Sequence, residues 1–232
     1  MALIQYIVVG WHFDNFPDLV EDLINLKKSN SPELLDIFWS CHKEPSDLIK
    51  STFNYKVFPN LGLEDGAYQQ ALDFLNLDDE TILFLIHDDL IVKDWGFFLE
   101  SIEYLNKGYF FVGNGFNYPA RLSRSLLQYV KPENLQFFSN FEEGQIVYTI
   151  RESFICTKRK YLKAIGDFEV IWKEPIPDKK GETHIGAIGN IQQTLLGAKI
   201  SLFHGKDKIK YLSDSYQDSK YLYEVARGKR IS

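Results

Sequence analysis

The chain has 232 residues, 45% of them hydrophobic, so it is long enough to bury one large core or two small ones. Its formal net charge of −6 excludes the global positive field with which general nucleic-acid-binding proteins attract their partner. Cys41 and Cys156 lie in apolar segments without metal-ligand spacing, which excludes a disulfide framework and favours a reducing compartment.

The two ends of the chain indicate where the protein works. The first residues lack a basic flank and a small-residue cleavage site, and no apolar run approaches the roughly 20 residues that span a bilayer. We therefore expect a cytoplasmic protein without a transmembrane segment. At the other end, Arg227, Lys229 and Arg230 would support only weak peripheral contact with an anionic membrane.

Strand-like and helix-like segments alternate through the first half of the chain, which is typical of βαβ units and a mostly parallel sheet. Apolar runs of strand length occur at residues 3–9, 34–42, 54–59 and 80–87. Helical spacing of apolar residues occurs at residues 16–29, 63–77 and 94–108. These patterns predict an α/β fold in which helices flank a central sheet.

The second half is less regular. A strand over 109–113 precedes about thirty residues rich in Asn, Ser and aromatics, which predict a functional loop region or small subdomain. A strand and helix follow over 152–168, and the polar segment 173–184 predicts a mobile loop. Residues 188–204 predict a helix that ends at Gly197 and a strand that ends at His204. No linker divides the chain, so we expect a single domain over 1–232.

The stretch ILFLIHDDLIV, residues 82–92, places His87, Asp88 and Asp89 directly after an apolar strand. In open α/β sheets, ligands bind outside the carboxyl ends of the strands. Two adjacent carboxylates repel each other there, and a divalent cation removes that penalty because hard oxygen ligands suit Mg²⁺ or Mn²⁺. The pattern predicts a metal clamp for a diphosphate. A solvated strand end followed by a turn would also explain two aspartates.

The segment ILFLIHDDLIVKDWGFFLESI resembles the metal-binding segment of GT-A fold glycosyltransferases, especially the inverting family-two group, in which an apolar strand enters an Asp-x-Asp or Asp-Asp-Asp signature. Four further segments resemble that family in the same order: YIVVGWHF, NLGLEDGAYQQALDFL, RESFICTKRKYLKAIGDF and GNIQQTLLGAKISLFH. The resemblance covers residues 3 to 205. It implies a single GT-A, Rossmann-like domain with a nucleotide-sugar half (1–113), an acceptor-side half (114–205) and a C-terminal extension (206–232).

The resemblance also implies site residues. Asp89 matches the metal ligand, Asp88 matches the middle acid that faces the sugar or ribose, and His204 matches a late histidine that approaches the metal. His87 stands where a triple-acid signature has its first Asp. The implied cofactor is Mn²⁺ or Mg²⁺. The donor-binding candidates are Gly10, Trp11, His12, His42, Asn60, Gly62, Asp65, His87 and Asp88.

The general base is less clear from the sequence. The family has an acidic pair at the start of its late helix, and in this chain those positions fall near Ile185 and Gly186. The closest candidates are Glu182, His184 and Asp178. Three explanations remain open: the base lies a few residues earlier on a closing loop, the enzyme retains configuration, or the protein binds a nucleotide sugar without turning it over.

Residues after the strand at 109–113 offer groups suited to sugars. Aromatic rings stack on sugar faces, and amide and guanidinium groups bond hydroxyls or phosphate. The acceptor-binding candidates are Asn114, Phe116, Asn117, Tyr118 and Arg121. The aromatic side chains are explained equally well by core packing or by a homodimer contact.

Together these features predict a metal-dependent, inverting hexosyl- or deoxyhexosyltransferase of polysaccharide biosynthesis. Its donor would be a UDP-, GDP- or dTDP-linked sugar, and its acceptor a glycan, a lipid-linked sugar or a protein. One alternative is a non-catalytic GT-A-like nucleotide-sugar-binding or scaffold protein. Another is a sugar-phosphate nucleotidyltransferase, although VVGWHFDNFPD lacks the glycine-rich basic loop of those enzymes. The absence of G-x-G-x-x-G after any strand argues against a dinucleotide oxidoreductase.

Overall fold

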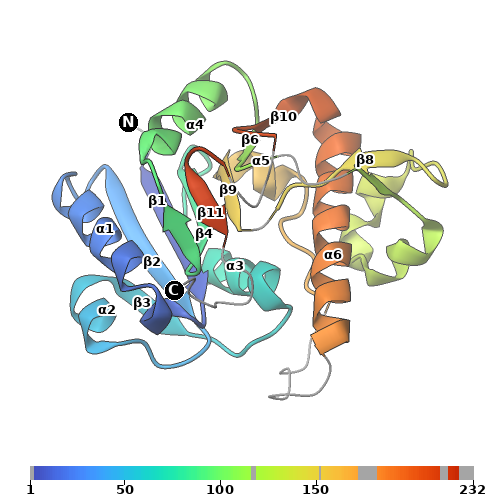
Figure 1. The fold of residues 1–232 in the computed structure, drawn as a ribbon. Coiled ribbons are helices and arrows are strands. Elements are labelled where there is room, and N and C mark those ends of the chain that lie inside the picture. The colour runs from blue at the N-terminus through green and yellow to red at the C-terminus, as the bar shows by residue number, and fades with distance from the viewer. Residues whose placement is uncertain (1–2, 116–118, 152, 172–181, 215–218, 225–232) are drawn as a thin grey trace.

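A seven-stranded sheet forms the centre of the protein in the computed structural model, which describes residues 3–115, 119–151, 153–171, 182–214 and 219–224 (Figure 1). The strand order is β10-β6-β9-β4-β1-β2-β3. The strands are β1 (Ile4–Gly10), β2 (Leu35–Cys41), β3 (Asn54–Val57), β4 (Ile82–His87), β6 (Phe111–Gly113), β9 (Phe154–Lys158) and β10 (Ile209–Tyr211). β9 runs antiparallel to β4 and β6, and the other neighbouring pairs are parallel.

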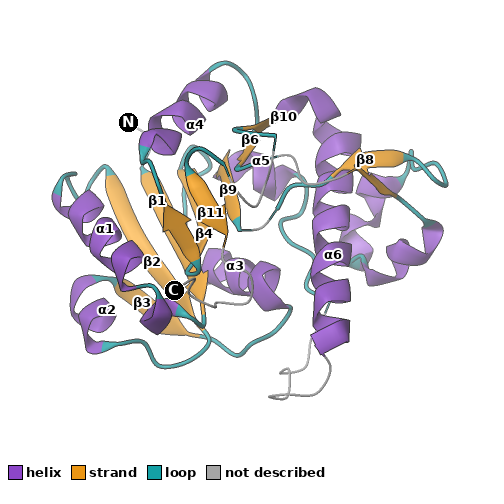
Figure 2. Cartoon of the chain, in the orientation of Figure 1, coloured by secondary structure: helices purple, strands orange, loops and turns teal. Residues whose placement is uncertain are grey.

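Helices cover both faces of this sheet (Figure 2). They are α1 (Pro17–Lys28), α2 (Asp47–Thr52), α3 (Leu63–Phe74), α4 (Gly96–Asn106), α5 (Arg159–Ala164) and α6 (Glu182–Lys199). Because successive strand side chains point to opposite faces, Tyr6 and Val8 of β1 join the core with α1, α2 and α4, while Ile7 and Val9 join the core with α3, α5 and α6. All six residues of β4 are buried, as expected for a strand covered on both sides.

A third, smaller core lies beside α6 and is built from the segments between β6 and β9. It contains the 3₁₀-helices η2 (Arg124–Tyr129) and η3 (Pro132–Phe138) and a hairpin of β7 (Pro119–Arg121) and β8 (Ile146–Tyr148). Leu195 and Ala198 of α6 pack into this cluster, so α6 separates it from the main sheet (Figure 1). The long irregular segment thus forms a small subdomain of its own.

The remaining described elements are short. η1 (Phe13–Asn15) follows β1, the π-helix η4 (Ile200–His204) continues α6, and η5 (Lys206–Lys208) leads into β10. β5 (Leu90–Val92) pairs antiparallel with β11 (Leu222–Glu224). No helix in the described part of the chain is both long and apolar enough to cross a membrane.

The alternating α/β prediction is confirmed, and so are the first four strands with their helices. One prediction for the second half is wrong. Gly197 does not end a helix, and His204 ends a π-helix instead of a strand. A Cβ at Gly197 would overlap the carbonyl oxygen of Tyr148, so this glycine allows close helix packing. The proposed C-terminal extension supplies β10 and β11, and most of the predicted loop 173–184 lies outside the described residues.

Candidate functional site

The carboxyl ends of β1, β2 and β4 lie in one row. Gly10 stands opposite Cys41, and Val9 stands opposite His87. The chain after each strand therefore leaves the sheet at the same edge, where α/β proteins bind their ligands. This brings the first two predicted loops and the acidic pair together.

Asp88 is folded back across the end of β1. Its backbone N–H donates to the carbonyl of Val9 at 2.9 Å, and its Oδ2 accepts from the backbone N–H of His12 at 2.5 Å. A Cβ on Gly10 would overlap the Asp88 carboxyl group, so glycine is required for this close approach. Only 3% of Asp88 is exposed. Val9, Gly10 and His12, at the end of β1, thus form a cradle for Asp88 at the end of β4.

The electrostatics of this cradle favour a positive ligand. Burial, together with the charge of neighbouring Asp89, raises the pKa of Asp88 to about 8. The N–H groups of His12 and Phe13 and the nearby His87 oppose this shift without cancelling it. A divalent cation beside the pair would supply the missing positive charge and favour the ionised form.

His87 lies beside Asp89, with 3.7 Å between its Nδ1 and Oδ1 of Asp89. Its ring stacks on Tyr68 of α3 at 6.2 Å between centroids, and its backbone N–H donates to the carbonyl of Ser153. The Asp89 side chain keeps 14% of its surface exposed and so remains reachable from solvent. His87 therefore links the acidic pair to α3.

The loops after β1 and β2 bring two predicted donor residues together. The rings of Trp11 and His42 lie 6.1 Å apart, and Trp11 is 37% exposed. Nδ1 of His42 lies 3.5 Å from the carbonyl of Phe58, and burial lowers the pKa of His42, so the imidazole is neutral at pH 7. The pair offers an accessible aromatic surface beside the backbone of His12.

The remaining donor candidates lie at the start of α3. Gly62 has φ +69°, in the left-handed region that favours glycine, and a Cβ there would lie 2.6 Å from Cγ1 of Val170. Asp65 is 3% exposed in the first turn of the helix, and Asn60 is half-buried just before it. The structure thus packs this turn directly against Val170, in the segment after α5.

The donor atoms fit a cation only in part. Among the residues whose side chains the structure describes, no group of three or more His, Cys, Asp or Glu could hold a metal. Asp88 and Asp89 supply hard carboxylate oxygens, which suit Mn²⁺ or Mg²⁺ when phosphate oxygens complete the coordination. Two carboxylates leave the coordination of a cation incomplete, so these residues fit a cation only when other oxygen ligands join them.

The prediction that His204 joins this metal site is wrong. Its Nε2 lies 3.0 Å from the carbonyl of Tyr161 in α5. That helix follows Lys158, which pairs with Ile82 at the start of β4, whereas Asp89 follows the end of β4. Six strand residues, roughly 20 Å, separate the two ends. His204 lies at the opposite edge because the chain continues as a π-helix and does not return to the crevice as a strand.

The acceptor candidates are only partly described. Asn114 follows β6 at the same sheet edge and is 1% exposed, and its Oδ1 accepts from Oγ of Ser219 at 2.6 Å. Arg121 is exposed on β7, in the hairpin beside α6. Phe116, Asn117 and Tyr118 lie outside the described residues. Asn114 thus anchors the C-terminal segment, a role that the sequence did not indicate.

The base candidates lie at the start of α6. Glu182 and His184 belong to its first turns, and Asp178 lies outside the described residues. Ten residues further on, about 15 Å along the helix, Nε2 of Gln192 donates to the carbonyl of Gly62 at 2.9 Å. In Figure 1 the amino end of α6 points to the same side as the carboxyl ends of β1 and β2. The first turns of α6 are therefore on the crevice side of the molecule.

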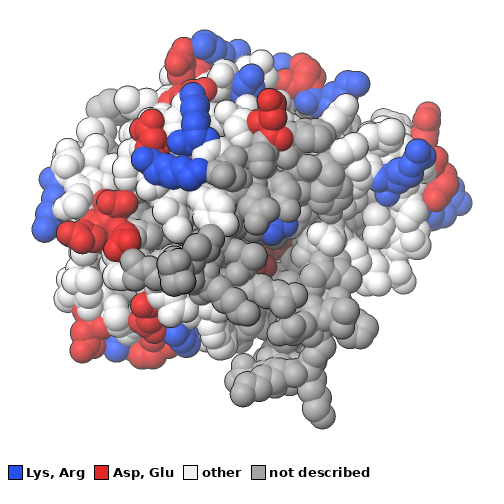
Figure 3. Space-filling model, in the orientation of Figure 1, with Lys and Arg blue, Asp and Glu red and all other residues white. Residues whose placement is uncertain are grey.

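One depression lies outside this site. A depression of about 870 Å³ between α4 and β10 is lined by tyrosine and lysine side chains, including Tyr104 and Lys210, and does not include the acidic pair. On the face drawn in Figure 3, acidic and basic side chains are interspersed, and charged atoms are visible at the floor of a central hollow. The described residues form no broad basic surface on that face.

Sequence reasoning missed Tyr68, which supports His87, and Gln192, which reaches Gly62. The adjacent glutamines in IQQTLL were a signal, because two buried amides in an apolar helix segment need polar partners. Nothing in the sequence around Tyr68 distinguishes it from an ordinary core residue.

No protein-family model matches the chain, and none of the curated proteins matches it. Solved structures do resemble it. A mycobacterial protein has a TM-score of 0.53 at 15% identity, over 92% of this chain and 65% of its own. Glucosyl-3-phosphoglycerate synthase from Mycobacterium tuberculosis, solved with Mn²⁺, UDP and glucosyl-3-phosphoglycerate, has a TM-score of 0.51 at 14% identity, over 94% and 73%. S. aureus TarS, solved with UDP-GlcNAc, has a TM-score of 0.53 at 13% identity, over 97% and 59%.

These likenesses show the fold. The chain shares the mostly parallel α/β architecture of these proteins, so the GT-A fold prediction is confirmed. The chain spans less than two thirds of the length of the mycobacterial protein and of TarS. The acidic pair lies at the carboxyl ends of β1 and β4, the edge where open α/β sheets bind their ligands.

Proposed function

We propose that this protein is a metal-dependent glycosyltransferase, which moves a sugar from a nucleotide-diphosphate sugar to a glycan-type acceptor. The observation that carries the proposal is the buried Asp88 beside Asp89, cradled by Gly10 at the carboxyl end of β4. Such a pair is stable in its ionised form when a cation joins it. The proposal is also supported by two solved structures of the same fold, which hold UDP or UDP-GlcNAc, one of them with Mn²⁺.

Different residues would bind different parts of the donor. Trp11 and His42 would offer a surface for the nucleoside, beside the end of β1, where Gly10 leaves room for the Asp88 carboxyl group. Asp89, with Asp88, would hold Mn²⁺ or Mg²⁺, which neutralises the charge of the leaving diphosphate. Asp65 and Asn60 would contact the donor from the start of α3.

The proton on the acceptor hydroxyl requires a base. We assign this role to the amino end of α6, where Glu182 or His184 would act, with Asp178 as the third candidate. The expected outcome is inversion at the sugar. Glu182→Gln and His184→Ala, assayed for transfer, would identify the base, and full activity in both variants would refute the assignment.

A thermal shift experiment tests the donor site. The protein is heated with UDP, GDP or dTDP, each with and without Mn²⁺. We expect one nucleotide to raise Tm only when Mn²⁺ is present, because the two carboxylates need phosphate oxygens to complete the coordination. Mn²⁺ alone should have little effect. Absence of any shift with all three nucleotides would refute the donor site.

Asp89→Asn is the matched variant for this experiment, because it removes one charge while keeping shape. It should abolish the metal-dependent shift and leave Tm without ligand nearly unchanged, since the side chain keeps part of its surface exposed. Persistent metal-dependent binding in Asp89→Asn would mean that the cation lies elsewhere.

A second candidate function is nucleotide-sugar binding without turnover. It is favoured by Ile185 and Gly186, which occupy the positions where the resemblance places the acidic pair. Hydrolysis of the donor in the absence of acceptor distinguishes the two. Slow release of free sugar supports the enzyme, whereas tight binding without any release supports the binding protein.

A further inference from the structure

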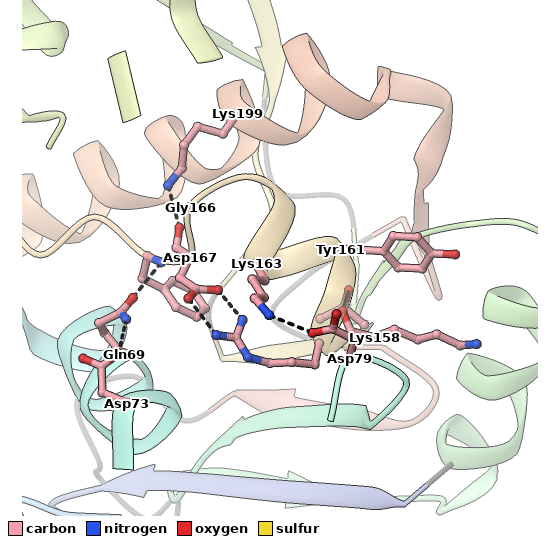
Figure 4. A network of polar contacts seen from close by, with 12 residues as sticks. Gln69, Asp73, Asp79, Lys158, Tyr161, Lys163, Gly166, Asp167 and Lys199 are labelled. Carbon is pink, nitrogen blue, oxygen red and sulfur yellow. Dashed lines mark hydrogen bonds and ion pairs between the residues drawn. The ribbon is translucent and has the colours of Figure 1, made fainter. Parts of the chain in front are cut away.

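The segment that follows α5 is held by a buried polar network. Nζ of Lys199 lies 2.9 Å from Oε1 of Glu169 and 2.5 Å from the carbonyl of Asp167. The side chains of this ion pair are 0% and 1% exposed. Nδ2 of Asn134 and the backbone N–H of Lys131 donate to the same carboxylate. Figure 4 shows Lys199 reaching from α6 to the turn at Gly166 and Asp167. Residues 166–170 are therefore fixed to α6 and to η3.

The same segment is fixed to α3 on its other side. The backbone N–H of Phe168 donates to Oε1 of Gln69 at 3.0 Å (Figure 4). The ring of Phe168 stacks on Tyr68 at 5.5 Å, and Tyr68 stacks in turn on His87. The acceptor-side segment thus contacts the helix that supports the acidic pair.

One side chain joins the segment to the donor crevice directly. Nε2 of Gln192 donates both to the carbonyl of Gly62, at 2.9 Å, and to the carbonyl of Glu169, at 3.0 Å. The carbonyl of Gly62 also accepts the N–H of Gly66, the first hydrogen bond of α3. A single amide group therefore bridges the start of α3 and the segment after α5.

Stability alone does not explain a glutamine at this position. Gln192 is 2% exposed, and its Oε1 has no hydrogen-bond partner among the residues that the structure describes. Burying such an oxygen costs free energy that a leucine of similar volume would not incur. What leucine lacks is the pair of N–H donors that hold two backbone carbonyls.

We propose that Gln192 is a positioning residue, which holds the Gly62 turn of the donor crevice against the Glu169 segment of the acceptor side. This inference rests on the proposed function, because it assigns the Gly62 turn to donor binding. Gly62 has no side chain that could fix its orientation, so the turn is held through the hydrogen bond that its carbonyl accepts. Without the amide, the start of α3 and the turn before it gain freedom.

The test compares Gln192→Leu with Thr194→Val. Thr194 is 6% exposed in the same helix, and its Oγ1 donates only to the carbonyl of Asn190 within α6. Both variants remove buried polar groups from α6, but only the first releases Gly62. Two quantities are measured in each: Kd for UDP in the presence of Mn²⁺, or for whichever nucleotide stabilises the wild type, and hydrogen exchange of the Gly66 amide.

We expect Gln192→Leu to raise Kd and to speed exchange at Gly66 by about tenfold each, as the loss of the buried hydrogen bond to the Gly62 carbonyl implies. Thr194→Val should leave Kd and the exchange rate at Gly66 within about twofold of the wild-type values, even if it lowers Tm as much as Gln192→Leu does. Equal Kd values and equal exchange in the two variants would overturn the positioning role. Should the wild type bind no nucleotide, the proposed function fails, and the exchange comparison alone decides whether Gln192 holds the Gly62 turn.

Discussion

Asp88 shows how a single residue depends on its neighbours. Its carboxyl group is buried, borders a second acid and receives the N–H of His12. The neutral form is favoured at neutral pH because burial raises its pKa to about 8. In the proposed function, arrival of the cation and diphosphate therefore releases a proton.

The stability of the metal-free protein should depend on this residue. Because the pKa of Asp88 in the folded state, about 8, lies above its ordinary value of 3.8, the folded protein binds this proton more tightly than the unfolded chain. The contribution is complete below about pH 4 and is lost as the pH rises to about 8. Urea unfolding with EDTA at pH 5.5 and 8.5 measures it.

Asp88→Asn is the comparison for this measurement. The decrease in the free energy of unfolding between the two pH values should be smaller in the variant by about 3 kcal/mol, from 1.36 kcal/mol per pKa unit. All other titrating groups are shared, so the difference isolates Asp88. Equal decreases in the two proteins would contradict the prediction.

Gly10→Ala should disable the site without unfolding the sheet. The added methyl group would overlap the Asp88 carboxyl group and push it out of its cradle. We expect Kd for nucleotide with Mn²⁺ to rise by about tenfold or more, as titration calorimetry would show. Gly113→Ala, at the end of β6, is the control, because its methyl group would meet only the side chains of Ile150 and Tyr211. A similar loss in both variants would refute a specific role for Gly10.

At the scale of elements, α6 differs most from its prediction. A glycine near the end of a periodic segment usually marks a helix end, and this rule placed the end at Gly197. The helix instead continues, because Gly197 packs against the backbone of Tyr148 and Thr149. The sequence carries no signal that distinguishes a packing glycine from a terminating one. The error also moved His204 to the wrong edge of the sheet.

Gly197→Ala tests this explanation. Alanine is the better helix former by about 1 kcal/mol, so a solvent-facing position would gain stability. Here the methyl group would overlap the carbonyl oxygen of Tyr148, and we expect a loss of about 2 kcal/mol in the free energy of unfolding by urea. A gain of stability would show that β8 moves away from α6 without cost.

At the scale of the whole molecule, the first half was predictable, whereas the second was predictable only in part. The strand over 109–113 and the strand and helix over 152–168 form as β6, β9 and α5, but the end of α6 and the segment after it differ. Apolar runs of strand length alternate with helical periodicity up to Asn106, and each segment became the expected element. Local patterns of this kind determine βαβ units. The acidic pair was predictable for the same reason, since its position depends only on the end of β4. The Lys199 and Glu169 pair was not, because thirty residues separate its members and no local pattern joins them.

The Lys199 and Glu169 pair joins α6 to the segment after α5, so its removal should lower the stability of the protein. Lys199→Met leaves the Glu169 carboxylate buried without its cation, so we expect a loss of about 3–5 kcal/mol in urea unfolding. The double variant with Glu169→Gln should recover at least about half of that loss, since no buried charge remains. Simple addition of the two single losses would contradict the assignment of a coupled pair.

The pairing of β11 with β5 also has a consequence for how the protein is made. β5 begins one residue after Asp89, yet its partner strand comes from residues 222–224, and Lys93 donates to the carbonyl of Ser219 across 126 residues. On the ribosome, the acidic motif emerges long before the strand that flanks it. Until residues 222–224 have been synthesised, a nascent chain therefore exposes an unpaired β-edge beside the acidic pair, and chaperones would meet it in that state.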